Sequence, residues 1–156
     1  MMKVRWGVLG TARIATEHVI PAMKAGAYCE VVAIASRNLA RAEEAARWLG
    51  LPRAYGSYEE LLAAADIDAV YIPLPNHMHV PWAVESLDAG KHVLCEKPVA
   101  LDAEEARELL AAAQGYPGRK VMEAFMYRFH PQWQRARHIV RSGGIGELRT
   151  IQSFFS

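Results

Sequence analysis

The chain has 156 residues, enough for one ordinary domain with a core, and its 52% hydrophobic and 22% charged residues exclude a disordered chain. A formal net charge of +1, from 18 basic and 17 acidic residues, argues against nucleic acid or an anionic membrane as a partner. The apolar stretches have the length of strands and fall far short of the ~20 residues of a membrane helix.

Strand-like and helix-like segments alternate along the chain. In chain order, the apolar runs that we expect to be strands are Val4–Leu9, Val31–Ala35, Ala54–Tyr55, Ala69–Ile72, His92–Cys95 and Lys120–Ala124. The helices expected between them are Ile14–Ala25 (interrupted at Pro21), Leu39–Leu49, one opened by a capping box at Ser57–Glu60, Pro81–Leu87, and one from the Asp102 cap to Ala113. This alternation predicts an α/β fold with a doubly wound parallel sheet of the Rossmann type.

The last thirty residues depart from this alternation. We expect a helix at Pro131–Arg141, a turn at Gly143–Gly146 and a strand at Leu148–Phe155. Six strands already complete a doubly wound unit, so this strand is expected to be the first strand of a second α/β domain. On its own it would present an unpaired apolar edge. The prediction is therefore a fragment with two parts, residues 1–125 and residues 126–156.

The first strand–turn–helix segment matches a dinucleotide fingerprint, G-x-G-x-x-G/A, at Gly10, Ala12 and Ala15. Gly10 permits the tight turn, and Ala15 allows the helix and the strand to pack closely. The amides at the helix start, which we assign to Thr11, Ala12, Arg13 and Ile14, are expected to hold a pyrophosphate. Ala12 departs from the pattern, because its methyl group stands where glycine usually lets the backbone approach the phosphates. The alternative is an ordinary tight turn between a strand and a helix.

The end of the second strand indicates which dinucleotide is bound. NAD-binding proteins usually carry Asp or Glu there to hold the ribose 2′-hydroxyl, whereas this chain has Ser36 and Arg37. A hydroxyl followed by a guanidinium suits a 2′-phosphate, because Arg offers both charge and a bidentate fork. The sequence therefore favours NADP over NAD. The alternative is that Arg37 is a solvated loop residue.

Two further segments follow the fourth and fifth strands, where open α/β sheets bind ligands. The first carries Leu74, Asn76 and His79, and the second is Glu96-Lys97-Pro98. A lysine at a cleft could polarise a hydroxyl or a carbonyl group. The alternative for Glu96 and Lys97 is a surface ion pair.

The cysteines and histidines do not indicate a metal site. Cys29 and Cys95 lie in apolar surroundings without a CxxC motif, which predicts buried, reduced thiols and a cytoplasmic protein. His77 and His79 lack a third ligand, so no metal is expected. We expect His79 to face a sugar or a cofactor, while His77 is left as a loop histidine.

The motifs at 10–15, Pro75–His79 and Glu96–Pro98 together resemble the glucose–fructose oxidoreductase-like (Gfo/Idh/MocA) family. The run Met122–Pro131 resembles most its branch of dihydrodiol and D-xylose dehydrogenases. The resemblance covers the whole chain and corresponds to the amino-terminal half of the family. It implies NAD(P)-dependent oxidation of a sugar or cyclic diol hydroxyl, or the reverse reduction.

By matching position, the resemblance implies a role for several residues. Lys97 is the implied catalytic residue, near both nicotinamide and substrate. The implied cofactor contacts beyond the phosphate turn are Leu74, Asn76, His79, Glu96 and Arg128. In the family a larger second domain supplies the remaining acid–base groups and often a dimer interface. We therefore expect a homo-oligomer formed through the terminal strand, and cofactor binding without turnover by this chain alone.

Two other functions are consistent with the same residues. One is a dinucleotide-binding module without catalysis, and the other is an interaction protein that pairs through its terminal edge strand. Cofactor affinity separates the first from the second, and turnover separates the first from an oxidoreductase.

Overall fold

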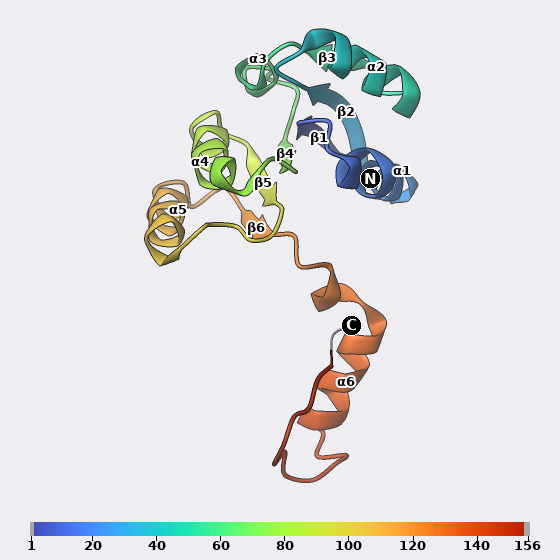
Figure 1. The fold of residues 1–156 in the computed structure, drawn as a ribbon, viewed down its shortest axis with the longest axis vertical. Coiled ribbons are helices and arrows are strands. Elements are labelled where there is room, and N and C mark those ends of the chain that lie inside the picture. Colours follow the sequence, from blue (N-terminus) through green and yellow to red (C-terminus); the bar gives the residue numbers. More distant parts are fainter. Residues whose placement is uncertain (1, 155–156) are drawn as a thin grey trace. The chain divides into compact units, whose positions relative to one another are not determined.

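All six strands expected in the first part of the chain form one parallel sheet in the computed structural model, which describes residues 2–154 (Figure 1). They are β1 (Val4–Leu9), β2 (Cys29–Ala35), β3 (Arg53–Tyr55), β4 (Ala69–Ile72), β5 (His92–Cys95) and β6 (Val121–Glu123). Their order is β3-β2-β1-β4-β5-β6, with every adjacent pair parallel. The direction of winding changes between β1 and β4, which confirms the doubly wound prediction. In such a sheet, ligands bind at this switch point, outside the carboxyl ends of the strands.

The connecting helices follow the predicted positions closely. They are η1, a π-helical turn (Ile14–Val19) that continues into α1 (Ile20–Ala25), α2 (Leu39–Leu49), α3 (Tyr58–Leu62), the 3-10 turn η2 (Asn76–Met78), α4 (His79–Asp88) and α5 (Ala103–Gly115). Pro21 lies at the start of α1, directly after the π-helical turn, and its missing N–H interrupts the regular series of helical hydrogen bonds there, as the sequence predicted. As predicted, the side chains of Ser57 and Asp102 accept hydrogen bonds from backbone amides of the first helical turn. No helix within residues 2–154 combines the length and hydropathy needed to cross a bilayer.

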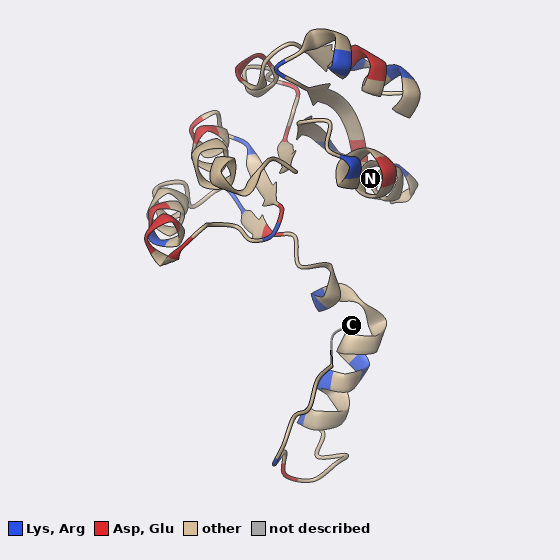
Figure 2. Cartoon of the chain, in the orientation of Figure 1, with Lys and Arg blue, Asp and Glu red and all other residues tan. Residues whose placement is uncertain are grey.

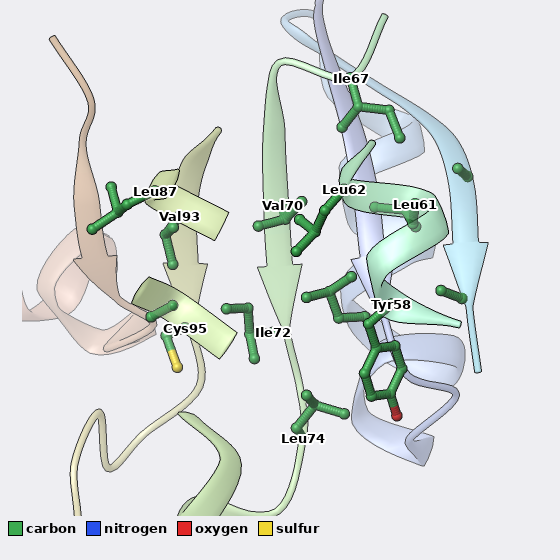
Figure 3. Close-up of a cluster of buried hydrophobic side chains, with 14 of the residues drawn as sticks. Tyr58, Leu61, Leu62, Ile67, Val70, Ile72, Leu74, Leu87, Val93 and Cys95 are labelled. Carbon is green, nitrogen blue, oxygen red and sulfur yellow. The ribbon is translucent and has the colours of Figure 1, made fainter. Parts of the chain in front are cut away.

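The sheet is buried on both faces. One core cluster includes Val8, Ile34 and Tyr71 from the strands and Ala15 and Leu49 from the helices of one face. The cluster on the other face is drawn in Figure 3, and its labelled members are Tyr58, Leu61, Leu62, Ile67, Val70, Ile72, Leu74, Leu87, Val93 and Cys95. Because both faces are covered, the strands consist of nearly continuous apolar residues. The two layers of helices thus fix the strand ends that carry the candidate site.

The chain separates into two compact units, residues 1–124 and 125–156. The second unit contains the 3-10 turn η3 (Met126–Phe129) and helix α6 (Pro131–Arg141), which was predicted and bears basic but no acidic residues (Figure 2). The predicted strand Leu148–Phe155 is wrong over residues 148–154, which have no regular structure, and Phe155 lies outside the described residues. A strand needs a partner for its backbone groups, and residues 125–154 contain no other strand for it to pair with.

The prediction of two buried thiols is half correct. Cys95 is fully buried at the end of β5, and burial raises the pKa of its thiol to about 12. Cys29 is only partly buried, because it is the first residue of β2 and precedes the fully covered stretch of that strand.

An ion pair at the amino ends of β1 and β4, opposite the strand ends that carry the candidate site, makes the stability of the fold depend on pH. The backbone amide and the guanidinium of Arg5 donate three hydrogen bonds of 2.7–3.0 Å to the Asp68 carboxylate, which lowers the pKa of Asp68 to about 2. A folded-state pKa below the unfolded value gives stability that is present above the unfolded pKa and is lost as the pH falls through the folded one. The contribution should disappear between about pH 4 and about pH 2.

We expect Asp68→Asn to flatten this part of the pH profile of the free energy of unfolding. Both side chains are more than a third exposed, so solvent screening limits the effect to about 1 kcal/mol or less. Urea unfolding at several acidic pH values measures it. Glu43→Gln, at an exposed position on α2, is the control. An identical acid dependence in wild type and Asp68→Asn would contradict the assignment.

Candidate dinucleotide-binding site

The turn after β1 has the geometry that a phosphate loop requires. Gly10 adopts a φ of +114°, a backbone conformation that residues with a Cβ atom rarely adopt. A Cβ built at this position would lie 2.9 Å from Leu74 Cδ2. Ala15 is fully buried where the helix meets the sheet, as its place in the fingerprint predicts. The amides of Ala15 and Thr16 both donate to the Ala12 carbonyl, so the amides before them belong to the open end of the helix. Such an end attracts anions.

The remaining residues of the turn differ in how far they are exposed. Thr11 and Ala12 are half-buried, and Ile14 is 37% exposed. The Arg13 guanidinium is engaged along the helix, with Nε 2.9 Å from Glu17 Oε1 and Nη2 3.0 Å from Oε2. Thr11 also lines a surface depression of about 410 Å³ that extends toward α2.

The end of β2 lies beside this turn, because the Gly10 amide donates to the Ala35 carbonyl at 2.8 Å. Ser36 is nearly buried, and its hydroxyl oxygen accepts a hydrogen bond from the Asn38 amide. Arg37 is exposed, and its guanidinium lies near the Tyr58 hydroxyl. Burial raises the pKa of Tyr58, and the positive charge of Arg37 partly offsets that rise. Among residues 2–154, no carboxylate lies within 4.0 Å of the Arg37 guanidinium. A cation without an acidic partner is thus available near the phosphate turn.

The segment after β4 contains a buried leucine, Leu74, and an exposed side-chain amide, that of Asn76. Leu74 is 8% exposed, and it lies beyond the end of β4 on the same side as Tyr58 (Figure 3). Asn76 and His77 are exposed in η2. His79 differs from the expectation that it faces a sugar or a cofactor. It is fully buried, and both of its ring nitrogens lie 2.7 Å from backbone carbonyl oxygens.

The segment after β5 is fixed by hydrogen bonds around Glu96. The Tyr71 hydroxyl donates to Glu96 Oε1 at 2.7 Å, and the Lys97 amide donates to Oε2 at 3.2 Å. The side chain of Lys97 is exposed, and within residues 2–154 it makes no ion pair with Glu96. The surface ion pair considered above is therefore not formed. The Lys97 amine is free to meet a ligand, while its backbone is held.

Arg128 belongs to the second unit, where it is exposed in η3. The other candidate residues all belong to the first unit, at the carboxyl ends of β1, β2, β4 and β5. The structure therefore brings four loops to one edge of the sheet and leaves the role of Arg128 a prediction. Within the described residues, no group of three or more His, Cys, Asp or Glu side chains is placed to hold a metal ion.

Two residues that support the site were not predicted. Tyr71 is fully buried in β4 and holds Glu96, and Glu123 at the end of β6 accepts a hydrogen bond of 2.9 Å from the Val99 amide. The usable signal for Tyr71 was a phenol inside an apolar strand, because a buried hydroxyl needs a partner. The burial and the bonded carboxylate raise the pKa of Tyr71, so it stays a donor at all ordinary pH values.

We expect Tyr71→Phe to release Glu96 without disturbing the core. The ring remains in place, and the loss of one hydrogen bond to a carboxylate should lower the free energy of unfolding by about 1–2 kcal/mol. If Glu96 lines a cofactor cleft, NADPH affinity should also fall several-fold, which a fluorescence titration measures. Tyr28→Phe, at a residue that is 63% exposed, is the control. Unchanged stability and affinity would show that the bond does not hold the loop.

Comparison with known proteins agrees with this geometry. The model of the Gfo/Idh/MocA oxidoreductase family, described as having an NAD-binding Rossmann fold, matches residues 4–125. An uncharacterized oxidoreductase of Rhizobium meliloti is 56% identical over 98% of this chain and 46% of its own length. A D-xylose 1-dehydrogenase (NADP(+)) of Haloferax volcanii is 49% identical over 97% of this chain and 46% of that protein. A trans-1,2-dihydrobenzene-1,2-diol dehydrogenase of Mus musculus is 39% identical over 99% of this chain and 46% of that protein.

Among solved structures, a 3-ketoreductase from Actinomadura kijaniata in complex with NADP and TDP-benzene superposes with a TM-score of 0.84 at 42% identity. The match covers 93% of this chain and 44% of that one. The chain thus spans about half the length of the relatives it matches. The relatives confirm the predicted resemblance, including the branch of dihydrodiol and D-xylose dehydrogenases. The family model, the relatives and the doubly wound sheet together show that this chain belongs to the Gfo/Idh/MocA oxidoreductase family and carries its NAD-binding Rossmann fold.

Proposed function

We propose that the chain is the NADP-binding part of a dehydrogenase that acts on a CH–OH group of a sugar or a cyclic diol. The observation that carries the proposal is the exposed Arg37, which has no carboxylate partner in the described chain and lies next to Ser36 beside the phosphate turn. A guanidinium and a hydroxyl at the end of β2 can bind a 2′-phosphate, whereas an NAD-specific site places a carboxylate there. The names of two relatives, which specify NADP, point the same way.

Each of the four loops has a part in this proposal. The open helix end after Gly10 would hold the pyrophosphate, and Ser36 with Arg37 would select the 2′-phosphate. Leu74, Asn76 and Glu96 would line the cleft toward the nicotinamide, and Lys97 would polarise the substrate oxygen and exchange its proton. The bound dinucleotide supplies the hydride chemistry. The substrate class comes from the relatives named for D-xylose and for a dihydrobenzenediol.

The test is a titration of the purified chain with NADPH and with NADH, followed by fluorescence. We expect NADPH to bind and NADH to bind more weakly. A folded chain that binds neither nucleotide, or that prefers NADH, would overturn the proposal. Incubation with NADP and either D-xylose or a dihydrodiol then distinguishes an enzyme from a binding module. We expect no turnover by these 156 residues, because near-attack geometry needs more substrate contacts than the four loops with Glu96 and Lys97 supply.

A second proposal concerns association of copies through the terminal residues 148–156. The exposed Leu148, Ile151 and Phe154 support it. Light scattering at several protein concentrations tests it, and a concentration-independent monomer would contradict it.

A further inference from the structure

The charges of the chain are unevenly divided between its two units. Residues 125–156 contain five arginines and one acidic residue, Glu147, whereas residues 1–124 contain 13 basic and 16 acidic residues. Figure 2 shows basic and no acidic residues along η3 and α6. Glu147 lies 2.6 Å from Arg149, and among residues 2–154 no carboxylate lies within 4.0 Å of the guanidiniums of the other four arginines. The second unit thus carries positive charge that its own residues do not offset.

Three of these arginines line one depression in the surface of the second unit. Arg137 and Arg141 are one helical turn apart on α6, and Arg128 lies in η3, before the helix. The depression has a volume of about 450 Å³, and its lining residues are Arg128, Phe129, Gln134, Arg137, His138 and Arg141. The negative end of the helix dipole attracts Arg141 in the last turn, but this attraction does not reach Arg128. Like charges one turn apart destabilise a helix, so a bound anion would stabilise this one.

Aromatic rings adjoin the arginines. A second depression, of about 290 Å³, is continuous with the first, because Arg128, Gln134 and Arg137 line both. Tyr127 and Trp133 complete its lining. Their ring centroids lie 6.2 Å apart at an interplanar angle of 69°, yet the two residues remain 50% and 56% exposed. Half-exposed rings beside guanidiniums suit a ligand that joins a planar ring to an anionic group, because the ring can stack while the anion is bound.

We propose that η3 and α6 form a binding site for a small molecule that carries a pyrophosphate group next to a planar ring. The guanidiniums bind the phosphoryl oxygens, because Arg offers both charge and a bidentate fork, and Tyr127 with Trp133 holds the ring. Depressions of this size fit a small ligand, whereas a helix of 11 residues is a short track for a nucleic acid.

The proposed site lies outside residues 4–125, which the family model matches, and it is separate from the four loops of the first unit. It therefore does not rest on the proposed function. It also gives Arg128 a ligand within its own unit, as an alternative to the cofactor contact that the family resemblance implies.

Site-resolved NMR of the full wild-type chain tests the site without a variant. Inorganic pyrophosphate is titrated into ¹⁵N-labelled protein, and the amide signals of residues 126–141 are followed separately from those of residues 10–16. We expect the signals of residues 126–141 to shift with one common dissociation constant, and orthophosphate to bind about tenfold more weakly because it engages fewer guanidiniums. The absence of a saturable shift in residues 126–141, or equal affinities for the two anions, would overturn the proposal. Because the phosphate turn is read from its own signals, failure of the proposed function leaves this result unaffected.

Two arginines of α6 provide a matched pair of variants. Arg137→Gln removes a charge from the lining of both depressions. Arg135→Gln removes the same charge from an exposed residue of the same helix that lines neither. We expect Arg137→Gln to raise the dissociation constant of pyrophosphate about tenfold, and Arg135→Gln to change it by less than about twofold. Equal effects of the two substitutions would mean that the net charge of the helix alone attracts the anion, and the proposed site would be wrong.

The planar part of the ligand is tested with ADP in the same NMR titration. Trp133→Leu should raise the dissociation constant of ADP by about fivefold to tenfold, because a stacked base loses its aromatic partner. It should change the dissociation constant of pyrophosphate by less than about twofold, which also shows that the variant is folded. Unchanged ADP affinity in Trp133→Leu would contradict the ring-binding part of the site. A single-stranded oligonucleotide that binds residues 126–141 more tightly than ADP would overturn the small-molecule proposal in favour of a nucleic-acid surface.

Discussion

Replacing Arg37 by alanine is expected to weaken NADPH binding by about 10- to 100-fold and to leave NADH binding unchanged. The guanidinium is exposed, has no carboxylate partner among the described residues and stands beside Ser36 at the end of β2. A charge-assisted contact to a phosphate is worth about 1.5–3 kcal/mol, and each 1.4 kcal/mol is about a factor of ten in affinity. NADH lacks the 2′-phosphate, so the substitution removes no contact to it. Parallel fluorescence titrations with both nucleotides measure the ratio.

The control for Arg37→Ala is Arg47→Ala, which removes the same charge from the last turn of α2. It should change neither affinity appreciably, because general electrostatic attraction falls off within about a Debye length in salt. Equal weakening of NADPH and NADH in Arg37→Ala would mean that Arg37 supports the loop rather than the 2′-phosphate. Salt dependence adds a check, since a direct phosphate contact makes NADPH binding the more salt-sensitive of the two.

Gly10→Ala is expected to lower the free energy of unfolding by about 2–4 kcal/mol and to abolish measurable nucleotide binding. Two costs combine at this position. The φ of +114° is strained for alanine, at about 1–3 kcal/mol, and the new methyl group would lie 2.9 Å from Leu74 Cδ2. Leu74 is itself packed into the core cluster, so its side chain has little room to move away. Any relaxation of the turn also displaces the amides that would hold the pyrophosphate.

Urea unfolding and NADPH titration together test the Gly10 substitution. Gly118→Ala is a suitable control, because a Cβ there meets no atom within 4 Å and the backbone is not in the left-handed region. That substitution should be neutral to within about 0.5 kcal/mol. A Gly10→Ala protein with wild-type stability and NADPH affinity would show that neither the strain nor the contact limits this turn.

Much of the first unit could be predicted because its signals are local. The run of apolar residues at Val31–Ala35 is buried throughout, as a central parallel strand must be. Gly50 ends α2 in the left-handed conformation, and Asp102 caps α5 with two hydrogen bonds. Each signal depends on a few neighbouring residues, so the elements and their order follow from the sequence pattern.

The terminal strand was mispredicted because its formation depends on residues far away. Leu148–Phe155 has apolar and β-branched residues, but such residues favour a strand only where a sheet surface is available. Residues 125–154 offer no such surface, and the described part remains irregular. Cys29 shows the same limit on a smaller scale, because it is the first residue of β2 and the buried stretch of that strand begins only at Val31.

In the candidate site, too, the sequence predicted the local features and missed those that depend on residues far apart in the chain. The rule that ligands bind at the carboxyl ends of parallel strands was enough to predict the four loops. The contacts that hold them join residues 19 to 25 positions apart, such as His79 with Pro98 and Tyr71 with Glu96. Sequence patterns do not encode such pairs. His79 was therefore expected to face a ligand, although the structure buries its ring against two backbone carbonyl oxygens.

The two edge strands of the sheet have a consequence for the behaviour of concentrated protein. β3 and β6 contain three residues each, and Arg53 in β3 is also tied to Asp66 by an ion pair. An edge this short presents few unpaired backbone groups and is a poor template for strand addition by another chain. During expression or refolding, this sheet is therefore protected against edge-to-edge aggregation by the shortness of its outer strands.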